Sequence, residues 1–256
     1  MRAVVLTKDL EDVFWNVVTK DFFDYYFFIY DWLLQRDKTK VLIAFEEDAL
    51  LGLMLIYDES VVQLRGEPAA VEFLLHNLVL EKIVVQAPEN CESVVLRKFP
   101  NFTLKEKILL MNVAKGEEHL DSVVKPEVLS SADAEAVALL MNECYPEMWS
   151  DITVKDVECR LPSEGSLWLG IRQQGKLVSF GYAMLTAKIS HVTWIATHPQ
   201  WRNKGYATSI VSALLGECLK KAPSAIIYVA ENNLAAKTVY LKVGFKPNKS
   251  YILIKT

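Results

Sequence analysis

An internal repeat constrains the fold of this chain more than any other feature of its sequence. Residues 41–51 (VLIAFEEDALL) superpose without gaps on residues 167–177 (LWLGIRQQGKL), and residues 84–90 (VVQAPEN) resemble residues 226–232 (IIYVAEN). The first pair is typical of a strand–turn–strand hairpin, and the second of a buried strand that ends in a polar turn. Short hairpins often resemble one another, but two matches in the same order favour a divergent tandem duplication. We therefore expect two similar halves of α/β structure.

A polar segment separates the two halves. Residues 115–126 (KGEEHLDSVVKP) end at a proline and follow the apolar run of residues 108–111, which is typical of a linker after a strand. We place the boundary near residue 122, so that the expected domains are residues 1–122 and 123–256. A chain of 256 residues is long enough for two cores of ordinary size.

The composition limits the partners and the compartment. A hydrophobic content of 52% with 23% charged residues is typical of an ordered globular protein. The net charge of −4 provides no general attraction to nucleic acid or anionic lipid, and the apolar clusters are too short to span a bilayer. We expect neither nucleic acid nor a membrane as a partner. The four cysteines form no CxxC pair, so no metal site is expected. The cysteines also show no disulfide framework, which favours a reducing compartment. Charged residues interrupt residues 1–15, so this segment lacks the apolar region of a signal peptide, and we expect a cytoplasmic protein.

The second half alternates between helical and strand patterns. Ser131 or Asp133 can cap a helix that ends near Cys144, and a hairpin turn is expected at residues 173–176. Apolar spacing predicts the other elements. Further helices are expected at residues 154–161, 205–219 and 234–243, and strands at residues 167–171, 177–185, 191–197, 226–229 and 251–254.

A loop that ends at Gly205 has the features of an anion-binding site. Pro199 ends the preceding strand, and the loop leads into the predicted helix at the glycine. The first N–H groups of a helix have no partner within it and lie at the positive end of its dipole, so they attract anions. Glycine lets a phosphate approach the backbone closely, and Arg202 and Lys204 add cationic donors. On its own, the same stretch is equally a loop with two solvated cations before a surface helix.

A second stretch, residues 231–245, follows the buried strand of the second half. Asn233 is a natural N-cap and Gly244 a natural helix terminator. Ala236 and Tyr240 share one helical face because they are four residues apart. By itself this stretch is a capped core helix, with Tyr240 as a core aromatic residue.

Together, the two stretches resemble the signatures of the GNAT superfamily, the GCN5-related N-acetyltransferases. The first signature, Arg/Gln-x-x-Gly-x-Gly/Ala, is matched by Arg202, Gly205 and Ala207. The second, Asn-x-x-Ala-x-x-x-Tyr-x-Lys-x-Gly-Phe, is matched by Asn233, Ala236, Tyr240, Lys242, Gly244 and Phe245. Residues 181–183 (GYA) and 195–199 (IATHP) look most like the FR47-like branch. The resemblance covers residues 126–256 directly, and residues 1–122 only through the internal repeat.

The resemblance implies a GNAT fold, in which helices flank a mixed, mostly antiparallel twisted sheet, here in a tandem arrangement. In this fold two strands splay apart, and the pantetheine arm of acetyl-CoA lies between them. The corresponding strands here are residues 191–197 and 225–230. Backbone N–H groups and the Arg202 side chain would hold the diphosphate of coenzyme A, and no metal is implied. The residues implied to bind the cofactor are Ile195, Ala196, Thr197, Arg202, Asn203, Lys204, Gly205, Tyr206, Ala207, Thr208 and Asn233.

The resemblance also implies catalytic residues. Direct attack of an amine on the thioester requires an unprotonated amine and a proton for the departing thiolate. Tyr240 stands at the family's usual general-acid position. His191 replaces the glutamate that many members carry on the strand, and a regular strand would place it on the same face as Thr193 and Ile195. His191 is therefore the candidate general base, and the alternative is a strand histidine with a structural role.

The first half lacks the features of a cofactor site. If it is a GNAT-like repeat, its phosphate turn falls near residues 64–70 (LRGEPAA). Pro68 has no N–H to donate, and Glu67 would repel a diphosphate. We expect a degenerate GNAT-like domain without a cofactor site, and therefore one active site per chain.

The sequence thus predicts an N-acyltransferase that moves an acetyl group from acetyl-CoA to a primary amine in a ternary complex. The partner is expected to be a small-molecule or peptide amine, and the chain a monomer or homodimer. A protein N-terminus, a lysine, an amino acid such as glycine, a polyamine and an amino sugar all stay open as acceptors. The alternative function is a non-catalytic acyl-CoA-binding or sensing module, and a third is a partner-binding protein without coenzyme A.

Overall fold

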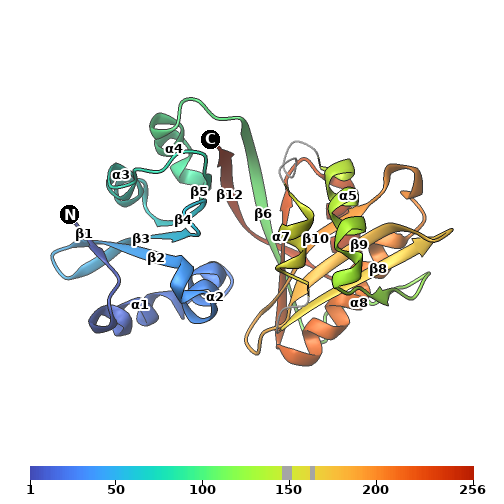
Figure 1. Ribbon diagram of the computed structural model, residues 1–256. Coiled ribbons are helices and arrows are strands. Elements are labelled where there is room, and N and C mark those ends of the chain that lie inside the picture. Colours follow the sequence, from blue (N-terminus) through green and yellow to red (C-terminus); the bar gives the residue numbers. More distant parts are fainter. Residues whose placement is uncertain (146–151, 162–164) are drawn as a thin grey trace. The chain divides into compact units, whose positions relative to one another are not determined.

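The chain divides into two compact units (Figure 1). The computed structural model describes residues 1–145, 152–161 and 165–256. Unit 1 comprises Met1–Leu109 together with Lys249–Thr256, and unit 2 comprises Leu110–Asn248. Among the described residues, no helix has both the length and the apolar character that crossing a membrane requires.

Unit 1 is built on strands in the order β1-β2-β3-β4-β5-β12, to which β12 contributes its residues from Lys249 onward. The first four strands pair antiparallel, β4 and β5 pair parallel, and β12 pairs antiparallel with β5. Helices cover the apolar side chains of both faces, which form two separate hydrophobic clusters. The strands are β1 (Arg2–Val5), β2 (Thr39–Glu46), β3 (Ala49–Tyr57), β4 (Val61–Gly66), β5 (Val84–Pro88) and β12 (Lys246–Lys255), and the helices are α1 (Glu11–Val18), α2 (Tyr26–Leu34), α3 (Pro68–His76) and α4 (Glu92–Lys98).

Unit 2 repeats this plan with the strand order β6-β11-β10-β9-β8-β7, to which β6 contributes its residues from Leu110 onward. Strands β7 to β10 pair antiparallel, and β10 and β11 pair parallel. One hydrophobic cluster packs α5 and α7 against β8 and β9. The strands are β6 (Leu104–Ala114), β7 (Glu127–Val128), β8 (Ser166–Gln173), β9 (Lys176–Met184), β10 (Ser190–Thr197) and β11 (Ser224–Ala230), and the helices are α5 (Ala134–Cys144), α7 (Val154–Glu158), α8 (Tyr206–Lys221) and α9 (Leu234–Lys242).

The predicted fold class is confirmed, since helices flank largely antiparallel sheets in both units. Most predicted elements of the second half agree with the structure to within two or three residues, as expected for element ends. The helix predicted at residues 154–161 ends earlier, at Glu158, and the strand predicted at residues 251–254 is longer, since β12 begins at Lys246. The added residues are mostly polar, so apolar spacing could not mark them as part of a strand.

The hairpins of the two halves correspond, although the gapless superposition of their sequences is one residue out of step. The turn follows Glu46 in β2–β3 and Gln173 in β8–β9, and both first turn residues have a positive φ. Each hairpin also has a register shift before its turn. The superposition aligned Glu47 with Gln173, because it matched apolar residues of the strands and ignored the turn geometry. The common order of pairings supports the duplication more strongly than the sequence match.

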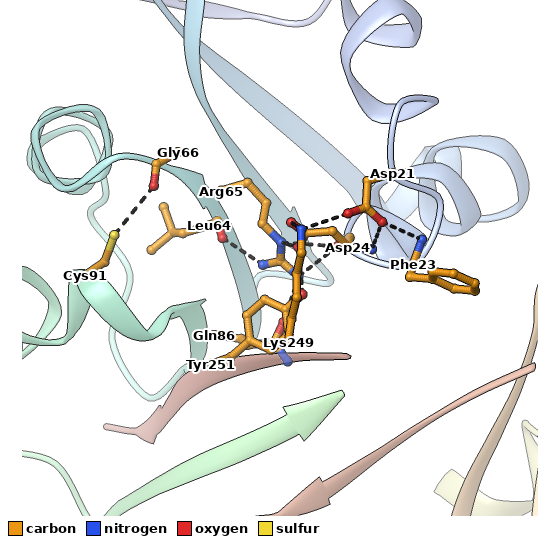
Figure 2. Close-up of polar contacts among 10 residues, drawn as sticks. All are labelled: Asp21, Phe23, Asp24, Leu64, Arg65, Gly66, Gln86, Cys91, Lys249 and Tyr251. Carbon is orange, nitrogen blue, oxygen red and sulfur yellow. Dashed lines mark hydrogen bonds and ion pairs between the residues drawn. The ribbon is translucent and has the colours of Figure 1, made fainter. Parts of the chain in front are cut away.

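A cluster of charged residues fastens β12 within unit 1 (Figure 2). The buried guanidinium of Arg65 in β4 forms an ion pair with Asp24 and donates to Gln86 at 3.2 Å. Asp24 also accepts hydrogen bonds from Lys249 at 2.6 Å and from the Tyr251 hydroxyl at 2.7 Å. Burial raises the pKa of Asp24, but Arg65, Lys249 and Tyr251 together hold it below its usual value. The carboxylate is therefore ionised and binds the C-terminal strand to the loop before α2.

Candidate active site

The parallel strands β10 and β11 of unit 2 separate partway along their length. Among the described residues, their register runs from Ser190↔Ala225 to Val192↔Ile227, whereas the strands continue to Thr197 and Ala230. Beyond Val192, backbone groups of β10 that face β11 are outside the parallel ladder. Such groups offer hydrogen bonds to an extended ligand lying between the strands. The two predicted strands of the cofactor site therefore have the expected separation.

A bulge at Trp194 changes which residues share a face of β10. Trp194 has a φ of +51°, and the pairing with β9 shifts register between Thr193 and Ala196. A β-bulge adds a residue and thereby reverses the alternation of side chains beyond it. His191 lies opposite Met184, in the α5-facing cluster, whereas Ile195 reaches the α8 side next to Gly181. The expectation that His191 shares a face with Ile195 is therefore wrong, because it assumed a regular strand.

The carbonyl groups of Ile195 and Thr197 point toward β11. The intervening carbonyl, that of Ala196, faces β9, where the Ser179 hydroxyl donates to it at 2.9 Å. Successive residues of a strand direct their backbone groups to opposite sides, so the two flanking carbonyls face the gap. The Tyr145 hydroxyl donates to Ile195 O at 3.0 Å, and Arg202 Nε donates to Thr197 O at 3.2 Å. Two side chains therefore hold the carbonyls of β10 that a ligand would contact.

The predicted diphosphate-binding turn lies at the N-terminus of α8. Asn203 and Gly205 both have left-handed backbones, with φ of +61° and +78°, and Gly205 is the N-cap. The first hydrogen bond of the helix runs from Ser209 N to Gly205 O at 2.9 Å. The amides of Tyr206, Ala207 and Thr208 therefore precede the first hydrogen bond of the helix and lie at its positive end, which favours an anion. The Lys204 ammonium lies 4.3 Å from the centre of the Trp201 ring.

Gly205 is also required by the packing of the linker. A β-carbon at this position would lie 2.8 Å from Val123 Cγ2, and the left-handed backbone disfavours any residue with a side chain. The amide of Val123 donates to Ser209 Oγ at 3.0 Å, and that of Asp121 donates to Ser212 Oγ at 3.1 Å. The linker therefore lies along small residues of α8. Sequence reasoning missed this contact, although glycine and serine at one-turn spacing on an apolar helix were its signal.

Asn233 and Tyr240 lie on α9, which follows β11. The Asn233 side chain accepts from Ala236 N at 3.1 Å, as predicted for an N-cap. Gly244 follows the C-cap with a φ of +106°, as predicted for a terminator. Tyr240 is buried, and burial raises the pKa of its hydroxyl, with Tyr145 adding to the rise. The phenol is therefore protonated at neutral pH and available as a hydrogen-bond donor.

His191 lies at the paired end of β10, where the strand is still bonded to β11. Its side chain is 7% exposed, and its ring centre lies 5.6 Å from that of Tyr228. Burial lowers the pKa of the imidazole to about 3, because the charged form loses its hydration. The ring is therefore neutral near pH 7, and its affinity for a proton in the free protein is low.

Two further residues at the end of α5 belong to this region, although no motif in the sequence marked them. Cys144 lies near Arg202, and burial raises the pKa of its thiol while the guanidinium opposes the rise. Tyr145 is near enough to Tyr240 to affect its pKa, and its hydroxyl contacts Ile195. The sequence predicted the strand, the turn, the last helix and a helix end near Cys144, but not that this helix end meets the other three. Among the described residues, no group of three or more His, Cys, Asp or Glu side chains is arranged to hold a metal ion.

The fold and this site define an α/β domain with an anion-binding helix N-terminus beside a gap between two parallel strands. Residues 134–245 match the family model described as the acetyltransferase (GNAT) family. Unit 2 therefore contains a GNAT acetyltransferase domain, and this relationship supports an acyl-transfer function. No curated protein matches the sequence of the chain.

Solved structures extend the similarity of fold over both units. An X-ray structure of a Drosophila protein has a TM-score of 0.76 at 11% identity, and the alignment covers 99% of this chain and 97% of that one. A GNAT-family acetyltransferase from Colwellia psychrerythraea has a TM-score of 0.62 at 13% identity, with 100% and 99% covered. A tandem GNAT protein from the clavulanic acid biosynthesis pathway has a TM-score of 0.55 at 11% identity, with 85% and 82% covered. At such identities the similarity concerns the fold, and it includes a tandem GNAT arrangement.

Proposed function

We propose that unit 2 binds acetyl-CoA and transfers its acetyl group to a primary amine. The observation that carries this proposal is the separation of β10 from β11 beside the N-terminus of α8. An extended pantetheine arm would find backbone partners at Ile195 and Thr197 in the gap. The diphosphate would bind the amides from Asn203 to Thr208 and the Arg202 side chain, which are chemically suited to an anion.

Tyr240 is the proposed general acid. The bound thioester supplies an activated carbonyl carbon, at which an N–C bond forms as the C–S bond breaks. The Tyr240 hydroxyl then gives its proton to the departing sulfur. The raised pKa of Tyr240 supports this role, because the phenol keeps its proton at the pH values at which an amine loses its own. The phenol can therefore donate a proton while the amine attacks.

His191 is the proposed acceptor for the proton of the amine, with a smaller contribution. Its burial keeps the imidazole neutral, which is the form that accepts a proton. A pKa of about 3 nevertheless makes it a weak base. We therefore expect the reaction rate to rise with pH chiefly because the substrate ammonium group loses its own proton.

Release of free thiol from acetyl-CoA, measured against a panel of primary amines, tests these roles. Removal of a general acid typically costs at least about a hundredfold in rate, so Tyr240→Phe is expected to lower kcat by this factor with little change in acetyl-CoA affinity. His191→Gln is expected to lower kcat/KM by less than about tenfold, because a weak base contributes less. Tyr57→Phe, in β3 of unit 1, is the matched control. An unchanged kcat in the Tyr240 variant would exclude it as the acid.

The second candidate function is a non-catalytic acyl-CoA-binding or sensing module. The burial of His191 favours it, because burial lowers the pKa of the imidazole and a domain without an effective base turns over slowly. Tight binding of acetyl-CoA with no thiol release across a broad amine panel would support the sensor and contradict the enzyme.

We propose residues 1–122 as a degenerate GNAT-like domain without a cofactor site and residues 123–256 as the catalytic domain. In unit 1, only Glu67 separates the end of β4 from Pro68, the first residue of α3. In unit 2, residues 198–205 form the corresponding loop. This difference supports one acyl-CoA site per chain. The acceptor is proposed to be a small-molecule or peptide amine, and the net charge of −4 weakly favours a cationic one.

A further inference from the structure

Tyr145 occupies a defined position at the gap between β10 and β11. It is the C-cap of α5, and its amide donates to Met141 O at 2.9 Å, which fixes its backbone to the last turn of the helix. Its hydroxyl donates to Ile195 O at 3.0 Å. The side chain therefore bridges the end of a helix and the part of β10 that has left the parallel ladder.

The bridged carbonyl is one that an extended ligand would need. Ile195 O and Thr197 O face β11, and each accepts a hydrogen bond from a side chain, Tyr145 or Arg202 respectively. An amide N–H that enters the gap loses its hydration and must find an acceptor there, since an unsatisfied buried donor costs free energy. A ligand amide that approaches Ile195 O in the gap thus meets an oxygen that already accepts from the Tyr145 hydroxyl.

We infer that Tyr145 closes the gap in the free protein and that entry of acyl-CoA exchanges its hydrogen bond to Ile195 for one from a pantetheine amide. This inference rests on the proposed function and assigns Tyr145 as a residue that sets cofactor affinity. The displaced Tyr145 hydroxyl remains close to Tyr240, since Tyr145 is near enough to raise the pKa of that phenol. Arg202 makes the parallel exchange, from Thr197 O to the diphosphate.

Tyr145→Phe tests the inference because it removes the hydroxyl and keeps the ring that packs against the hydrophobic cluster of unit 2. Titration calorimetry compares coenzyme A with 3′-phosphoadenosine 5′-diphosphate, which has the diphosphate but no pantetheine. A net hydrogen bond is worth about 0.5 to 1.5 kcal/mol, so loss of the competitor is expected to tighten coenzyme A binding about two- to tenfold. Affinity for the fragment is expected to stay unchanged, because it does not reach Ile195.

The control is Tyr57→Phe, with thermal unfolding of both variants to check that they are folded. Unchanged or weaker coenzyme A binding by the Tyr145 variant would overturn the inference, and so would an equal gain for both ligands. If neither wild type nor variant binds coenzyme A, the proposed function fails, and this inference fails with it. The three results are distinguishable because the fragment reports on the diphosphate turn independently of the gap.

Discussion

The buried carboxyl of Asp31 in α2 makes stability depend on pH. The residue is 8% exposed, and desolvation raises its pKa from 3.8 to about 7. The folded chain therefore binds this proton more tightly than the unfolded chain. Between these two pKa values, stability falls as pH rises, and the loss is complete above about pH 7.

Asp31→Asn is expected to remove this loss. The variant should exceed the wild type in free energy of unfolding by up to roughly 4 kcal/mol at pH 8, since each pKa unit is worth about 1.4 kcal/mol. Near pH 4 the two proteins should differ much less, because this pH lies close to the unfolded-state pKa of 3.8 and little of the loss has developed there. Urea unfolding at the two pH values measures the difference, and an identical dependence on pH in both proteins would contradict the assignment.

Single residues of the site differ in how far the sequence predicts them. The capping roles of Asn233 and Gly244 and the start of a helix at Gly205 are predicted from their immediate neighbours, because helix ends are local properties. The sequence does not predict which face of β10 His191 shares with its neighbours, since the bulge at Trp194 arises from pairing with β9. Tyr145 was missed because its role depends on a carbonyl fifty residues away in the chain.

At the scale of elements, helix α8 contacts the segment between the two halves through Asp121 and Val123, and its N-terminus forms part of the candidate cofactor site. Gly205→Ala is expected to lower stability by about 1 to 2 kcal/mol, the typical cost of a left-handed backbone in a residue with a side chain. The new β-carbon would also press on Val123 at 2.8 Å and shift the start of the helix. Coenzyme A binding is therefore expected to weaken by about tenfold, or 1.4 kcal/mol.

Gly216→Ala is the matched control in the same helix. Its β-carbon would meet Leu120 Cδ1 at an ordinary 3.4 Å, and alanine is favoured over glycine within a helix. This variant should be at least as stable as the wild type and bind coenzyme A equally well. Equal stability and affinity of both variants, measured by urea unfolding and calorimetry, would show that Gly205 has no special role.

At the scale of the whole molecule, the internal repeat predicted two similar α/β halves. It did not predict that Lys249–Thr256 belongs to unit 1, where Tyr251, Ile252 and Ile254 are buried. A strand pattern shows that a segment is extended but does not identify its partner, and β12 pairs with β5 far away in the sequence. Topology of this kind depends on long-range contacts that short motifs do not encode.

The two units also differ at the position of the proposed phosphate turn. Unit 2 has the loop of residues 198–205 before α8, whereas α3 of unit 1 begins with Pro68 directly after Glu67. A proline at the first helical position removes one amide from the helix N-terminus, and the glutamate opposes an anion. We therefore propose that acyl-CoA binds to unit 2 alone.

Titration calorimetry of acetyl-CoA into the full chain tests this central claim most directly. We expect saturable binding of one molecule per chain, and we expect Gly205→Ala to weaken this binding. Two equivalent sites, or binding that the Gly205 variant leaves intact, would contradict the placement of the site, and no binding at all would contradict the acyl-CoA-dependent function itself.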